Sequence, residues 1–291
     1  MVSLDDAEEF LWLNARLIDR LRFEHLFRGG DPTRVVTALR PYRNPDGGFG
    51  NALEPDLRGP HSQPVPVDLA LFLLDEAGAL GSDTTGSDLV RGILDYLSSI
   101  TRPDGGVPFV LPSALRSPHA PWWQVEEGLP GALNPTGSLL GHLHKNGVRD
   151  AWIDHATAFC WRGIEALTQT SPYEVRAVLS FLERVPDRER AEQAWRTFGP
   201  MVLAGGHVAL DPQADGEVTS PLAVAPRPGS LARSLFSAEV IDSHLDALAA
   251  AQQPDGGWGF TFASWTPITT PEWRGWATIE ALVTLRDNGR L

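Results

Sequence analysis

The chain alternates between segments of helical apolar periodicity and stretches rich in Gly and Pro. Residues 5–28 carry Phe10, Leu13, Leu17 and Leu21 at helical spacing, which predicts one amphipathic helix. Similar periodicity predicts further helices at 33–42, 66–78, 86–100, 135–147, 150–168, 172–185, 187–203, 238–252 and 271–287. Only 107–111 and 207–210 are expected to be short extended pieces. The pattern therefore predicts an all-α protein.

A Pro-Asp-Gly-Gly motif recurs in this pattern, at 44–50, 102–108 and 253–259. Gly205-Gly206 lies near the position that the repeat predicts for a further copy, here degenerate (the worn copy), so the chain has an internal period of about 50 residues. A loop follows each motif and leads to a helix started by proline, at Pro66, Pro135 and Pro271. Asn134 and Thr270 are expected to be N-caps of two of these helices.

Repeated helix–turn–loop–helix units predict about six helical hairpins. The proline-started helices are rich in small and apolar residues and are expected to form an inner ring, while the more highly charged helices form an outer ring. We therefore predict an α/α toroid, and because no linker divides the chain, one domain over residues 1–291.

Composition narrows the classes of function. The chain has 291 residues, of which 42% are hydrophobic, so it can bury a core, and its net charge of −13 argues against a general binder of nucleic acid or of an anionic membrane. No transmembrane segment or secretory signal is found, so a cytoplasmic location is expected, with peripheral membrane contact left open. The oligomeric state is not predicted.

Metal and thiol chemistry find little support. Cys160 is the single cysteine, so we expect no disulfide within the chain, no Cys-rich zinc site and an inert buried thiol. The histidines form no metal-binding motif, and His142 and His144 are expected to point to different sides of a helix. We predict no metal and no cofactor.

Residues 252–260, Gln-Gln-Pro-Asp-Gly-Gly-Trp-Gly-Phe, contain a Gln, three residues, a Gly, one residue and a Trp. This resembles the QW repeat of the terpene cyclases and the related turn of protein prenyltransferase β subunits. The two earlier copies are weaker, because Arg43 and Thr101 replace the glutamine and Phe49 and Val107 replace the tryptophan. The resemblance implies an α/α toroid with a cavity inside the inner ring and a hydrophobic small-molecule substrate.

The chain departs from that family where the chemistry is concerned. Cyclases that protonate an alkene use the middle Asp of an Asp-x-Asp-Asp motif, and here the nearest match, 65–68, keeps only the final residue, Asp68. Val67 stands at the position of the acid. The Asp-Asp-x-x-Asp metal motif and the zinc ligands of the prenyltransferases are also absent from the sequence.

The loop at 51–64 is the richest in chemistry, with Glu54, Asp56, Arg58, His61 and Gln63 close together. A carboxyl group in an apolar cavity has its pKa raised by desolvation and can then act as a general acid. We predict Asp56 as the catalytic acid with Glu54 as the next candidate, and Arg58, His61 and Gln63 as substrate contacts. The alternative is structural: Arg58 pairs with Glu54 or Asp56 and holds the loop.

Further substrate contacts are predicted at residues that the repeats bring to the loops or to the first turns of inner helices: Asp68, Trp122, Trp123, Asn134, Trp265 and Trp273. Aromatic faces stabilise carbocations through cation–π contacts and equally stack on sugar rings, so they do not separate these substrate classes. Packing of the tryptophans as a lid, and Asp68 or Glu272 as a first-turn helix acid, are the structural alternatives.

Three functions remain open. The first is proton-initiated cyclisation of a polyprenyl or meroterpenoid substrate. The second is a carbohydrate-active α/α-barrel enzyme, a hydrolase, lyase or epimerase, that uses loop carboxylates. The third is a non-catalytic toroid that binds a lipid or a protein partner. An apolar tunnel with one buried acid favours the first, an open polar cleft with two acids about 5–10 Å apart the second, and a filled cavity the third.

Overall fold

The structure is a computed structural model that describes residues 2–81, 84–206, 208–214 and 219–291. In this part of the chain every regular element is a helix, and the only extended pairings are isolated bridges, among them one at Val107 and one at Val208. The all-α prediction is therefore confirmed. Residue 207 of the expected extended piece 207–210 lies outside the described residues. None of the described helices has the length and apolarity needed to cross a bilayer.

Contacts between residues group the chain into two compact units. Unit 1 comprises Met1–Gly30, Gln169–Pro172 and Gly199–Leu291, and unit 2 comprises Asp31–Thr168 and Tyr173–Phe198. Helix α9 (Arg188–Ala204) contributes residues to both. The single-domain organisation stays a prediction.

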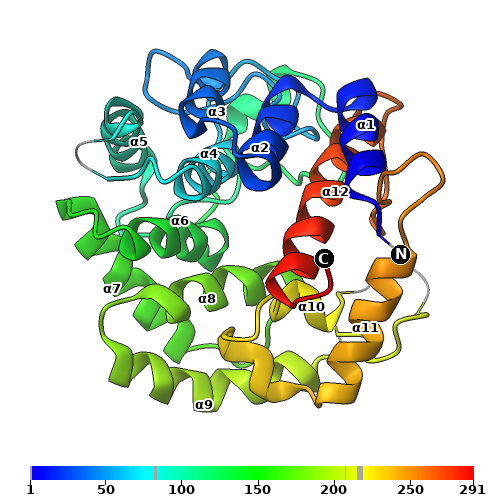
Figure 1. Ribbon diagram of the computed structural model, residues 1–291. Coiled ribbons are helices and arrows are strands. Elements are labelled where there is room, and N and C mark those ends of the chain that lie inside the picture. The colour runs from blue at the N-terminus through cyan, green and yellow to red at the C-terminus, as the bar shows by residue number, and fades with distance from the viewer. Residues whose placement is uncertain (1, 82–83, 207, 215–218) are drawn as a thin grey trace. The chain divides into compact units, whose positions relative to one another are not determined.

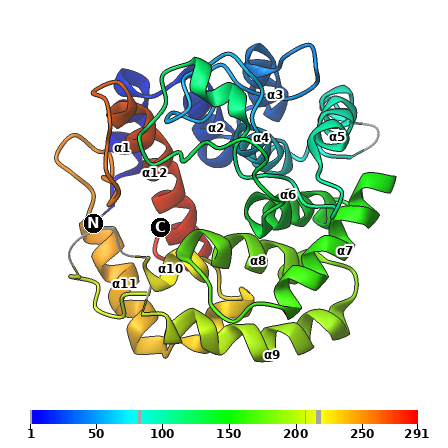
Figure 2. The same cartoon turned by 180° about the vertical axis from the view of Figure 1, so that it is seen from behind.

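Unit 2 consists of two layers of helices. Helices α4 (Pro64–Glu76), α6 (Leu133–Lys145) and α8 (Pro172–Arg184) lie side by side (Figures 1 and 2), and α5 (Ser87–Ile100) and α7 (Ala151–Glu165) pack against this row. The unit also contains α3 (Pro32–Leu39) and the short 3-10 helices η1 (Arg40–Tyr42) and η2 (Pro112–Arg116).

The row in unit 2 is parallel because contacts advance together along its helices. On α4 and α6, Asp68 meets Ser138 and Asp75 meets His142. On α6 and α8, a Cβ added at Gly137 would lie 2.6 Å from the carbonyl oxygen of Ala177, and one added at Gly141 would lie 2.6 Å from that of Ser180, so glycine lets the two backbones approach closely. Predicted inner helices are thus neighbours of one orientation.

Unit 1 contains α1 (Leu4–Asn14), α2 (Leu17–Arg28), α10 (Pro221–Val224), η3 (Leu231–Leu235), α11 (Ala238–Ala250) and α12 (Thr269–Asp287). Its core is formed by apolar side chains from α1, α2, α11, α12 and the last turn motif, among them Phe10, Leu11, Phe23, Leu245, Trp258, Ile279 and Leu282. Helices α2 and α12 are parallel, since Ala15 lies against Gly275 and Arg22 pairs with Glu280 further along.

The single helix predicted at 5–28 is wrong. The backbone is extended at Ala15 and Arg16, which ends α1 and starts α2. Ala15 is 3% exposed and fills the space that a side chain at Gly275 would need. This break leaves Leu13 and Leu17, which the periodicity predicts to be buried, 73% and 59% exposed. A tertiary contact thus overrides the local pattern.

The prolines predicted to start inner helices lie in first turns. Pro66, Pro135 and Pro271 are each the third residue of their helix. The predicted N-cap role of Thr270 is wrong, because Thr270 lies inside α12. Asn134 lies within the bounds of α6, but its extended backbone directly before Pro135 is the conformation expected of an N-cap. Asn134 has non-helical backbone angles at a kink and precedes the cis Pro135 bond.

The three turn motifs share one backbone hydrogen-bond pattern. In each, the amide of the residue before the proline donates to the carbonyl of the second glycine, at 2.8–2.9 Å, and the Asp carboxylate accepts from the amide of that glycine; the residue pairs are Asn44 with Gly48, Arg102 with Gly106 and Gln253 with Gly257. The first glycine has a φ of 87°, 93° and 88° in chain order. The sequence repeat is therefore also a structural repeat.

Each turn docks on a helix of its own unit in the same way. In the first copy Gly47 lies against the backbone of Gly92 on α5, and Gly48 lies against the ring of Tyr96 one turn later. The second copy repeats this on α7 and the third on α1, with aromatic partners Phe159 and Phe10. Gly206, in the worn copy, has a φ of 66° but no atom within 4 Å of its Cβ position, so it does not dock in this way.

Candidate functional site

The loop after the first turn motif has an unusual backbone. Asn51 and Ala52 have φ values of 55° and 61°, in the left-handed region that disfavours residues with a Cβ. The turn they form carries Glu54 and Asp56 inward, and each is 4% exposed. The Asp56 amide donates to Oε1 of Glu54 at 3.2 Å, and the Asp56 carbonyl accepts from the amide of Ala120 at 2.9 Å. The two predicted acids therefore lie together, with hydrogen bonds to the loop.

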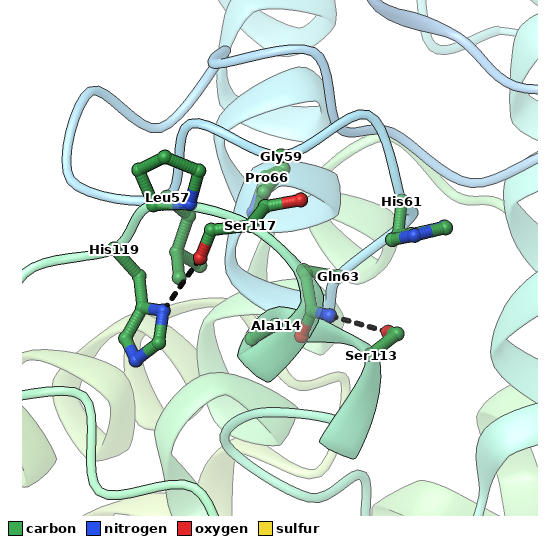
Figure 3. A pocket seen from close by; sticks show the side chains of 10 residues that line it. Leu57, Gly59, His61, Gln63, Pro66, Ser113, Ala114, Ser117 and His119 are labelled. Carbon is green, nitrogen blue, oxygen red and sulfur yellow. Dashed lines mark hydrogen bonds between the residues drawn. The ribbon is translucent and has the colours of Figure 1, made fainter.

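A pocket adjoins this loop, lined by Leu57, Gly59, His61, Gln63, Pro66, Ser113, Ala114, Ser117, Pro118 and His119 (Figure 3). Its cavity volume is about 10 Å³, room for about one water molecule and far below the range typical of sites for drug-sized ligands. Gln63 spans it, accepting from the Leu111 amide at 2.8 Å and donating to the Ser113 hydroxyl at 2.7 Å. His61 and His119 lie on opposite sides of it.

Three other residues of unit 2 that are predicted as substrate contacts lie in different surroundings. Nη1 of Arg58 lies 3.4 Å from the carbonyl oxygen of Pro55, within its own loop. Trp123 is 8% exposed and stacks on Phe109 with ring centroids 4.8 Å apart, whereas Trp122 is 44% exposed. The twin tryptophans thus split into one packed ring and one surface ring.

A second polar cluster joins α4 to α6. The Ser138 hydroxyl donates to Oδ2 of Asp68 at 2.8 Å. Oδ1 of Asp68 is buried with no hydrogen-bond partner among the described residues, and Nε2 of His142 lies 4.0 Å from it. The Asp68 side chain as a whole is 24% exposed. One face of the carboxyl group is thus held by protein while part of the side chain stays accessible.

The other nitrogen of the imidazole faces a second carboxylate. Nδ1 of His142 lies 3.3 Å from Oδ2 of Asp75, whose side chain is 8% exposed. Asp75 also accepts from Asn146 at 2.8 Å and from Lys145 at 2.9 Å. The imidazole therefore lies between two carboxyl groups of α4, two helical turns apart.

The pKa values of Asp68 and Asp75 are shifted in opposite directions. Desolvation raises the pKa of Asp68 above its ordinary value, and the opposing effects of His142, Ser138 and Arg176 are smaller. Burial also acts to raise the pKa of Asp75, but hydrogen bonds from His142, Asn146 and Lys145 outweigh it and hold this pKa well below its usual range. Carboxyl groups whose pKa values are moved apart in this way are typical of an acid and its ionised support.

This cluster can exchange a proton with a bound molecule. An ionised Asp75 accepts a hydrogen bond, so it favours a proton on Nδ1 of His142 and leaves Nε2 facing Asp68. Asp68 combines a raised pKa, partial exposure and neighbouring polar groups, as a general acid requires. Phe72 borders the cluster, with its ring edge-on to that of His142 at 5.9 Å.

Asp68 is predicted from the sequence as a substrate contact, whereas Asp75, Ser138 and His142 are not among the predicted site residues. A signal was present: Ser138 and His142 follow Asn134 at intervals of four, which gives α6 one polar face. As expected, His142 and His144 point to different sides, since His144 lies 3.0 Å from the Thr157 hydroxyl of α7. The buried state of Cys160 is confirmed, and burial raises the pKa of its thiol.

Two predicted contacts belong to unit 1. Trp273 lies in the first turns of α12, edge-on to Phe262 with centroids 5.0 Å apart, and Trp265 lies in the preceding loop. The Nε1 atoms of both tryptophans are buried with no hydrogen-bond partner in the described parts of the chain. No group of three or more metal-binding side chains is found among the residues that the structure describes.

No family model matches the chain, and no curated protein matches it.

Proposed function

We propose that the chain is a terpene-cyclase-like enzyme that starts cyclisation of a polyprenyl or meroterpenoid substrate by protonating a double bond, with Asp68 as the proton donor. The proposed fold is an α/α toroid of about six hairpins, with the substrate in its cavity. The parallel row α4, α6 and α8, backed by α5 and α7, supports this fold in unit 2, and the parallel pair α2 and α12 supports it in unit 1.

The observation that carries the proposal is the environment of Asp68. Its pKa is raised by desolvation, Ser138 fixes one of its oxygens and His142 lies beside the other. Asp68 is also the residue that the resemblance aligns with the last Asp of the family's acid motif. In this proposal Asp68 takes over the donor role predicted for Asp56 or Glu54.

The proposed reaction needs no added redox partner. The Asp68 carboxyl transfers its proton to one carbon of an alkene, and the positive charge that forms on the other carbon is attacked by the next double bond of the substrate. The last cation then loses a proton, which replaces the one that Asp68 supplied, so the product is an isomer of the substrate. Phe72, half-buried on the same face of α4, can stabilise a cation through its ring.

A carbohydrate-active enzyme is the second candidate, because one observation favours it. The cluster around Asp68 is polar: Asp75, Ser138, His142 and Lys145 all contribute. Two carboxyl groups on either side of an imidazole suit acid–base chemistry on a hydroxylated ring as well as on an alkene.

Product analysis tests the proposal. The full chain is incubated with linear polyprenols, squalene and prenylated aromatics, and in parallel with a panel of aryl glycosides, and products are identified by mass spectrometry. We expect a cyclic product of unchanged mass from one isoprenoid, formed by the wild type and by neither Asp68→Asn nor heat-inactivated protein. Release of the aryl group from a glycoside, with no isoprenoid product, would contradict the cyclase and support the second candidate.

A further inference from the structure

We propose that one end of unit 1 lies on the surface of a zwitterionic lipid bilayer. This apolar end consists of Trp12, Leu13 and Leu17 at the α1–α2 junction and Ile268 just before α12. Their exposed fractions are 41%, 73%, 59% and 55%. The inference is independent of the chemistry proposed for Asp68, which belongs to unit 2.

Contacts among α1, α2 and α12 place the four side chains at the same end of unit 1. Ala15 lies against Gly275, so the start of α2 and the first turns of α12 are at one level. The guanidinium of Arg274 lies 4.4 Å from the ring centre of Phe10, which places the end of α1 there as well. Figures 1 and 2 both show the loop before α12, in orange, beside this part of α1.

Two of the segments that build this end carry no charge. Residues 10–15 contain no Asp, Glu, Lys or Arg, and neither do residues 259–271, although 21% of the whole chain is charged. The second segment also contributes Phe260, Phe262 and Trp265. Tryptophan and other aromatic rings beside exposed aliphatic side chains are typical of the interface between lipid headgroups and acyl chains.

The charges around the apolar end favour a neutral lipid surface. Arg16 is bound to the buried Asp19 at 2.8 Å, and Arg20 lies over the ring of Trp12, 5.6 Å from its centre. Glu9 is exposed one turn before Trp12 and Leu13, so it offsets Arg20. The protein carries a net charge of −13, which would be repelled by an anionic bilayer. Apolar insertion, with little electrostatic attraction, is therefore the expected mode of binding.

The area of the apolar end also favours a lipid bilayer over a protein partner. Its four side chains expose on the order of 400 Å² of surface, the size of the largest apolar patch on a typical monomer, which is often functional, but about half of the roughly 800 Å² that each partner contributes to a stable interface. A bilayer needs no matching surface, because individual side chains enter it.

Vesicle flotation tests this inference on the full chain. The protein is mixed with phosphatidylcholine vesicles at 0.15 M and 0.5 M salt, and the partition coefficient is measured for the wild type, Leu13→Glu and Leu291→Glu. Leu291 is a matched control: it is 46% exposed, it follows the opposite end of α12, and its variant adds the same charge. We expect binding that salt does not weaken, an at least tenfold loss in Leu13→Glu, and no change in Leu291→Glu.

Three results would overturn the inference. They are absence of wild-type binding to phosphatidylcholine, equal binding by Leu13→Glu and Leu291→Glu, and binding that requires anionic lipid and disappears at 0.5 M salt. Sedimentation velocity completes the test: a wild-type dimer that Leu13→Glu converts to a monomer, without vesicle binding, would assign the apolar end to a second copy of the chain.

Discussion

Replacing Asp68 by asparagine is expected to lower turnover about 10³-fold, within the range that a positioned general acid contributes. Asparagine keeps the shape of the side chain and an oxygen that can accept from Ser138, but it has no carboxyl proton to donate. Turnover is measured on the substrate found by product analysis, with circular dichroism as the check on folding.

Asp56→Asn is the matched comparison, because Asp56 is also a buried carboxylate of unit 2 and is the acid predicted from the sequence. If Asp56→Asn abolished turnover while Asp68→Asn kept more than a tenth of it, the assignment of Asp68 would be wrong. The acid would then lie in the loop at 51–64.

Asp68→Asn should lower turnover without lowering the stability of the folded protein. The folded-state pKa of Asp68 is raised, so the folded protein binds this proton more tightly than the unfolded chain does. The contribution of Asp68 to stability is therefore fully present below its unfolded pKa, about 3.9, and declines as pH rises through the folded pKa. At a pH above the folded pKa, where the Asp68 carboxyl is ionised, Asp68→Asn removes a desolvated charge, and we expect its melting temperature there to be no lower than that of the wild type.

Replacing Gly47 by alanine is expected to destabilise the protein by about 4 kcal/mol or more, a loss that only a few mechanisms produce. Two effects combine: a φ of 87° is unfavourable for a residue with a Cβ, and the Cβ itself would overlap the carbonyl of Gly92 on α5. Because the overlap is with backbone, no side-chain rotation relieves it. Urea denaturation measures the change.

Gly78→Ala separates these two effects. Gly78 has a φ of 63° in the same unit, but no atom lies within 4 Å of its Cβ position. Its substitution should therefore lose only the backbone term, about 1–2 kcal/mol. Equal losses in the two variants would mean that docking of the turn on α5 contributes nothing, and that the repeated motif acts only through its backbone conformation.

The fold was predictable where local chemistry decides it. Pro, Asp and two glycines specify a tight turn, and the recurrence of this motif with helical segments between predicted both the helices and the repeat of the turn. The break at Ala15 was not predictable, because it depends on contact with Gly275, far away in the sequence. Consequently Leu13 and Leu17 have the periodicity of core residues but lie at the surface.

The candidate site was predictable only in part, for a similar reason. The loop carboxylates Glu54 and Asp56 were evident from composition, and the left-handed backbone at Asn51 and Ala52 that buries them was not. The grouping of Asp68, Asp75 and His142 depends on the register between α4 and α6, which close approach of helices sets. No local pattern specifies that register.

The measurement that tests the account most directly is a pH titration of the Asp68 carboxyl group in the free protein. Carbon NMR of protein labelled at aspartate carboxyls, assigned with Asp68→Asn, gives its pKa without any substrate. We predict a pKa above the ordinary value for aspartate, while Asp75 titrates far below it. An Asp68 pKa at or below the ordinary value would contradict the account, because desolvation would then not hold the proton on Asp68, and the property that marks it as the donor would be absent.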